Sequence, residues 1–175
     1  MRRTAALVAA LVCLTAAYVG LTHLTGAGGT ATPEAAPAAR LAPVAAPAVR
    51  MSPAARYSRK AHDATNVQRV EHGVTELRRG DCVQRFAVRQ AKAMAAATHM
   101  YHQELEPILE QCGLSAVGEN VAYGYPNGKA VVRGWMGSDG HRANLLNGDW
   151  RLMGIGARKG ADGLWYVSQV FGRKG

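Results

Sequence analysis

The chain is 175 residues long, which allows one folded domain of ordinary size beside a shorter N-terminal part of different composition. Its 21 lysine and arginine residues outnumber its 12 aspartate and glutamate residues, so the formal net charge is +9. The basic residues are spread along the chain and are not clustered with aromatic residues, which argues against a nucleic-acid-binding protein.

Residues 1–25 have the pattern of an export segment. Two arginines, Arg2 and Arg3, precede an apolar run that is close to the roughly 20 residues that a membrane span requires. We therefore expect either an export signal or an N-terminal membrane anchor, and a secreted or extracytoplasmic protein that contacts a membrane only through this segment. Residues 26–55 are rich in alanine and proline and carry few large apolar side chains, so they are interpreted as an extended linker.

The folded domain is expected over residues 56–175, beginning with two helices. Asp63 is a favourable N-cap for a helix that ends before Gly73, with Val67 and Val70 on its inward face. A longer helix is predicted over residues 81–101, because apolar residues recur there at steps of three and four. On this prediction His102 lies at the end of the second helix.

Three shorter helices and a β-hairpin complete the domain. The helices are expected over residues 106–112, over residues 129–136 and after Ser138. Two strand-like segments, 152–158 and 164–171, flank a glycine-containing turn and predict the hairpin. Helices followed by paired strands indicate an α+β domain with helices packed on an antiparallel sheet.

Two cysteines lie beyond the leader, Cys82 and Cys112. An even pair in an exported protein is most simply a disulfide. Neither cysteine has the spacing to another cysteine or histidine that metal or catalytic roles use. A bridge between them would stabilise the domain by roughly 3–4 kcal/mol on the chain-entropy model.

Three polar residues stand where packing alone does not require them: His102, Glu119 and His141. Two imidazoles and a carboxylate suit a divalent metal such as zinc, but they also suit a hydrogen-bonded polar cleft without metal. Their separations match no local metal-binding motif. From the residues alone, two surface histidines and a capping glutamate are the favoured interpretation, and the cluster is the alternative.

Longer motifs surround these residues. They are GENVAYG at 118–124, WMGSDGHRANLL at 135–146, GIG at 154–156 and WYVSQVFG at 165–172, with Asn66 and Arg69 three residues apart in the first helix. In this order the motifs resemble the CAP superfamily, the SCP-like group of cysteine-rich secretory, antigen 5 and pathogenesis-related-1 proteins, in its short bacterial form.

The resemblance implies an α-β-α sandwich with a shallow cleft in which His102, Glu119 and His141 meet. Many members carry a second glutamate where this chain has Ser138, so the acidic set is incomplete here. Arg142 could attract an anionic ligand to the cleft or could serve only the helix surface. We interpret Asn120, Trp135 and Asn144 as architectural: an amide that fixes loop backbone, a core aromatic side chain and an anchor at a helix end.

Two functions from different classes follow. The first is a monomeric, non-enzymatic binding module, because the family is associated with lipid or sterol binding, with protein or envelope partners, and with a divalent metal, which His102 and His141 would hold here. The second is a hydrolase that uses Glu119 as a general base while the histidines hold a metal or polarise a carbonyl. The chain has no nucleophile elbow, and this absence favours the binding module.

Overall fold

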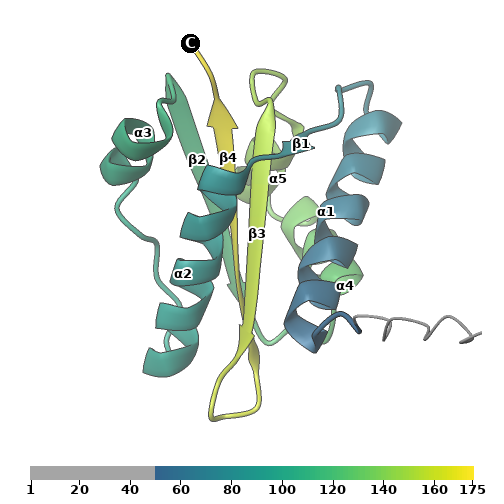
Figure 1. Ribbon diagram of the computed structural model, residues 1–175. Helices are drawn as coiled ribbons and strands as arrows, with labels where there is room; N and C mark the ends of the chain where they lie inside the picture. The colour runs from purple at the N-terminus through teal and green to yellow at the C-terminus, as the bar shows by residue number, and fades with distance from the viewer. Residues whose placement is uncertain (1–49) are drawn as a thin grey trace, which may run out of the picture. The chain divides into compact units, whose positions relative to one another are not determined.

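The computed structural model describes residues 50–175, and the expected leader and most of the expected linker lie outside these residues. Helices and strands are interspersed along the described chain, which ends in two consecutive strands (Figure 1). The elements are α1 (Pro53–Glu71), β1 (Arg78–Arg79), α2 (Asp81–Ala97), α3 (Glu106–Cys112), β2 (Ala116–Tyr123), α4 (Gly128–Met136), α5 (Asp139–Leu146), β3 (Leu152–Lys159) and β4 (Trp165–Arg173). Within residues 50–175, no helix is both long enough and apolar enough to cross a membrane.

The four strands form one sheet in the order β1-β3-β4-β2. The predicted hairpin is confirmed as β3 and β4, and β2 pairs antiparallel with β4 along its whole length. The expectation of a wholly antiparallel sheet is wrong at one edge, because the two-residue strand β1 pairs parallel with the start of β3. That short pairing leaves most of the outer edge of β3 without a neighbouring strand.

Helices cover both faces of the sheet, as the α-β-α sandwich requires (Figure 1). Side chains alternate along β4, so Val167 and Phe171 pack with α1, α4 and α5, whereas Tyr166 and Val170 pack with α2. The predicted fold class, α+β with helices packed on a sheet, is therefore confirmed. The sheet is therefore packed between two hydrophobic layers, one formed with α1, α4 and α5 and the other with α2.

Helix α1 begins ten residues before the predicted start. Ser52 is the N-cap, since its hydroxyl accepts a hydrogen bond from the Ala55 amide at 3.1 Å and a proline follows it. The predicted cap, Asp63, lies in the middle of the helix, and the last residues of the expected linker belong to α1. Val67 and Val70 are 52% and 59% exposed, so the predicted inward face is also wrong.

The true inward face of α1 repeats every four residues: Tyr57, Ala61, Thr65 and Arg69 are buried. Two of the four are polar, and this is why a search for apolar periodicity selected a different face. Arg69 is fully buried.

Helix α2 begins where predicted but ends four residues early. Its N-cap is Gly80 rather than Asp81, which is the first helical residue. The helix stops because Thr98 adopts a left-handed conformation, with φ of 46°. Tyr101 is consequently exposed and outside the buried stripe, and His102 lies in the irregular segment before α3 instead of at a helix end.

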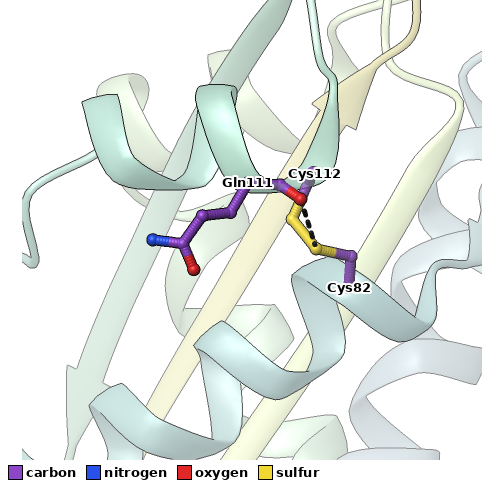
Figure 2. Close-up of a disulfide and its surroundings, with 3 residues drawn as sticks. All are labelled: Cys82, Gln111 and Cys112. Atoms are coloured by element: carbon purple, nitrogen blue, oxygen red, sulfur yellow. Dashed lines mark hydrogen bonds between the residues drawn. A yellow bond between two sulfur atoms is a disulfide. The ribbon is translucent and has the colours of Figure 1, made fainter.

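The predicted disulfide is present and ties α2 to α3 (Figure 2). Cys82 lies in the first turn of α2 and Cys112 is the last residue of α3, with their Cα atoms 5.7 Å apart. The bridge borders a hydrophobic cluster that includes Val83 and Ile108. Helix α3 therefore has a covalent anchor in addition to its small buried face.

Helix α2 approaches β3 very closely at two glycines. A Cβ on Gly154 or Gly156 would collide with the backbone of α2 at Gln84 and at Ala87 respectively. The Gln84 side chain also completes the unpaired edge of β3. Its amide nitrogen donates to the Ile155 carbonyl at 2.8 Å, and its amide oxygen accepts from the Ile155 nitrogen at 3.1 Å.

Candidate functional site

Glu119 is a buried carboxylate in the middle of β2, a strand that was not predicted. Its side chain is hidden under the irregular segment that follows α2, and the residue is only 5% exposed. Four groups donate to it: the Gln103 backbone nitrogen and side-chain amide, the Ser168 hydroxyl and the His102 ring. Each carboxylate oxygen thus accepts two hydrogen bonds, so the charge is compensated without water.

His102 is held by Glu119 and is otherwise open. Its Nδ1 lies 2.9 Å from Glu119 Oε2, and the side chain is 59% exposed. Because an ionised carboxylate can only accept, we assign the proton to Nδ1, which leaves the lone pair of a neutral ring on Nε2. Within residues 50–175, Nε2 has no hydrogen-bond partner.

His141 reaches the same place from the first turn of α5. Its Nδ1 lies 2.9 Å from the hydroxyl of Ser138, the N-cap residue of that helix. Burial lowers the pKa of His141 below the usual 6.5, and the nearby ring of His102 lowers it further. The two imidazoles are therefore close enough to influence each other electrostatically, and in the described part of the chain Nε2 of His141 is also without a partner.

The site lies on the outer edge of β2. Glu119 points to the face that α2 covers, and Asn120 points to the face that α5 covers, so His102 and His141 approach β2 from its two faces. The Asn120 amide donates to the His141 carbonyl at 3.2 Å, and Asn144 donates to the Glu119 carbonyl at 3.2 Å. These amides fix α5 to β2, in agreement with the architectural roles expected of them.

Trp135 is buried in the core, and its indole nitrogen donates to the Val121 carbonyl at 3.2 Å. Together with Asn144 it supplies donors to the outer edge of β2. Arg142 does not face the cleft: its guanidinium donates to Asp139 at 2.7 Å and to the Met136 carbonyl at 3.1 Å. These contacts are those of the helix-surface role, and attraction of an anionic ligand by Arg142 stays a prediction.

A cavity of about 590 Å³ adjoins the histidines. Ser138 and His141 line one end, and its walls are mainly apolar and aromatic, including Met100, Tyr123 and Trp135. Sequence reasoning missed these walls. Tyr123 and Met100 are large apolar side chains that remain exposed, and the two tyrosines of the Tyr-Gly-Tyr-Pro segment were the available signal.

The two histidines could supply a metal ion with two ring nitrogens as ligands. Among residues 50–175 there is no group of three or more His, Cys, Asp and Glu side chains placed to hold a metal ion. The pair nevertheless fits a weakly liganded site, because both Nε2 atoms are free and Glu119 orients one ring from behind, as carboxylates do behind metal-bound histidines. Water or a ligand would complete the coordination shell.

Arg69 was expected only as part of a motif, yet it supports the site from the opposite end of α5. Its Nη1 donates to the carbonyls of Leu145 and Asn147 at 2.7 and 2.9 Å, and its Nε donates to the Thr75 carbonyl at 2.8 Å. Burial lowers the pKa of its guanidinium, and Arg151 lowers it further. A buried cation at the C-terminus of α5 also complements the helix dipole.

Comparison with known proteins identifies the family. Residues 62–171 match the model of the CAP family, the cysteine-rich secretory protein family. This match covers more than half of the chain, and with the sandwich fold it shows that the protein belongs to the CAP family, as the sequence motifs indicated.

Individual relatives agree with this assignment. A 39-residue stretch is 54% identical to the uncharacterized membrane protein YlbC of Bacillus subtilis, and it spans 22% of this chain but 11% of that protein. Among solved structures, an extracellular protein containing an SCP domain from Bacillus anthracis is 26% identical, with a TM-score of 0.62, covering 73% of this chain and 45% of that one. A cysteine-rich secretory protein from Staphylococcus aureus also has a TM-score of 0.62 at 22% identity, covering 71% of this chain and 40% of that one. The chain thus spans less than half the length of these relatives.

Proposed function

We propose that this CAP domain works outside the cytoplasm as a binding module, with a divalent cation such as zinc held between His102 and His141 and an apolar ligand group in the adjoining cavity. The observation that carries the metal proposal is the orientation of the two rings. Each is held through Nδ1, by Glu119 or by Ser138, while Nε2 has no partner within residues 50–175. Neutral imidazole nitrogens of this kind are common zinc ligands.

Export is supported by three independent features. The N-terminal segment has the charge and apolar pattern of an export signal. The bridge between Cys82 and Cys112 belongs to an oxidising compartment. The Bacillus anthracis relative is described as extracellular.

The contacts of Glu119 favour binding over hydrolysis. A general base needs a free lone pair facing a water molecule, and both oxygens of Glu119 already accept two hydrogen bonds each. Ser138 does contact His141, but through Nδ1, and no carboxylate in the described part of the chain orients the other ring nitrogen. A bound cation would supply a Lewis-acid position that takes an oxygen atom of the ligand.

Zinc calorimetry on the purified protein tests the metal proposal. We expect His102→Ala combined with His141→Ala to abolish zinc binding. The matched control, His72→Ala combined with His99→Ala, removes two exposed imidazoles and should bind like the unaltered protein. Glu119→Gln should weaken zinc binding by about 10–100-fold, because it removes the carboxylate behind His102. Equal binding by both double variants would contradict the proposal.

The apolar part of the site needs a separate measurement. Binding of a fluorescent fatty acid should quench Trp135, which lines the cavity, and Tyr123→Glu should weaken it by placing a charge on the cavity wall. Turnover of peptide or ester substrates that disappears in Glu119→Gln would instead support the hydrolase.

A further inference from the structure

A second groove lies on the opposite edge of the sheet, between α1 and α2. Three adjoining cavities of about 180, 280 and 340 Å³ make it up, and all three are lined by Arg79 and Gln84. Residues of β3, among them Ala157, lie at its base. Because β3 and β2 are on opposite sides of the central strand β4, this groove is separate from the histidine cleft.

The lining of this groove is strongly cationic. No aspartate or glutamate lines any of the three cavities, and none of the basic side chains makes a salt bridge within the described residues. The basic residues are Arg59, Arg79, Arg85, Arg89, Lys92 and Arg158. They come from α1, β1, α2 and β3, so the fold brings six positive charges from separate segments of the sequence together around this groove.

Helix α2 carries half of these cations in a line. Arg85, Arg89 and Lys92 are four and three residues apart, so they share one face of the helix over about 10 Å. Like charges at these spacings cost about 0.2–0.5 kcal/mol per pair in an isolated helix. All three side chains are exposed, so the packing of the core does not explain why three cations stand next to one another. The Arg89 guanidinium lies 4.3 Å from the centre of the Phe86 ring, which restrains its position.

The smallest cavity also contains a polar atom without a partner. His62 lines it, and Nε2 of that ring is buried with no hydrogen bond in the described structure. The charged groups around the ring are Arg79, Asp63 and Glu76. Burial of a polar nitrogen without a partner costs free energy, and an acceptor on a bound ligand would relieve this cost by taking a hydrogen bond from Nε2.

We propose that the groove between α1 and α2 binds an extended polymer of phosphate groups that carries no aromatic bases. Guanidinium groups match phosphate geometry, and a line of three cations matches successive charges better than a single ion. Among the lining residues there is no Phe, Tyr or Trp on which bases could stack, so a nucleic acid is disfavoured. A recessed groove also suits a chain better than the flat surface of a membrane.

Binding of inorganic polyphosphate, followed by fluorescence anisotropy at several salt concentrations, tests the proposal. We expect Arg79→Gln combined with Lys92→Gln to weaken binding at least tenfold. The slope of log affinity against log salt should fall by about 1 for each cation removed. The matched control is Lys129→Gln combined with Arg133→Gln, which removes two exposed cations from α4 and should change affinity less than twofold.

The alternatives give different results. Equal losses in the groove and control variants, or no polyphosphate binding at low salt, would overturn the proposal. It would also be overturned if single-stranded DNA of equal charge, or vesicles of anionic phospholipid, bound more tightly than polyphosphate. Zinc binding should be the same in the groove variant and in the unaltered protein, so the result is independent of the histidine site.

Discussion

Replacing Arg69 with methionine tests how much of the site depends on a residue far from the histidines. The substitution keeps the length of the side chain and removes its charge and its donors. Three carbonyls then lose their partner, those of Thr75, Leu145 and Asn147. Two of these carbonyls belong to the end of α5, the helix that carries His141.

The expected cost follows from these bonds. A hydrogen bond to a charged group contributes about 1.5–3 kcal/mol, so three of them are worth several kcal/mol. Part is recovered because methionine removes a buried cation, whose Nη2 has no partner in the described structure. We expect a net loss of about 3 kcal/mol, which is a large share of the 5–15 kcal/mol that stabilises a typical domain.

Urea unfolding followed by tryptophan fluorescence measures this loss. With a slope of about 1.5 kcal/mol per molar, the midpoint should fall by about 2 M. Arg142→Met is the control: Arg142 is half-exposed and pairs with an exposed aspartate, so we expect a change below about 0.5 kcal/mol. If Arg69→Met also stayed within about 0.5 kcal/mol of the unaltered protein, the reasoning would be refuted.

Three further outcomes are expected. Cys82→Ser combined with Cys112→Ser should lower the free energy of unfolding by about 3–4 kcal/mol in the same urea assay, and a reducing agent should then have no additional effect. Burial lowers the pKa of His62 and of His141 below 6.5, so the unfolded chain takes up protons that the folded domain does not, and stability should fall as the pH drops below about 6.5. His62→Gln combined with His141→Gln should flatten that part of the pH profile, and an unchanged profile would contradict the assignment. Gln84→Leu should cost about 1–3 kcal/mol, because it leaves a backbone nitrogen and a carbonyl on β3 without partners.

Short sequence patterns correctly predicted α3 and the β-hairpin, because the residues that begin and end these elements lie within or next to them in the sequence. The range of α3 was predicted to the residue because Pro107 stands in its first turn and a glycine, Gly113, follows its last residue. In the structure Gly113 has the left-handed conformation that ends such a helix, with φ of 58°. The hairpin was predicted because two strand-like segments flank a short glycine-containing turn. The start of α1 was missed because Ser52 and Pro53 lie in alanine- and proline-rich sequence that resembles a linker.

The site shows the other limit of sequence reasoning. Strand β2 was not predicted because its centre holds Glu119 and Asn120, polar residues that are buried only because other elements supply their hydrogen bonds. The expectation that His102 and His141 share one site came from the resemblance to a family and not from their spacing in the sequence. Gln103 and Ser168, which complete the environment of Glu119, had no signal in the sequence.

Two edges of the sheet are closed by side chains where no further strand pairs with them: the part of β3 beyond its short pairing with β1, and the outer edge of β2. The Gln84 side chain makes hydrogen bonds to the backbone of β3 that a neighbouring strand would make. The side chains of Trp135 and Asn144 do so along β2. An open strand edge invites a second copy of the chain to add its own strand, which is the first step of aggregation. The remaining edge of β3 lies among cations that would repel an identical copy. We therefore expect this protein to tolerate high local concentration without polymerising.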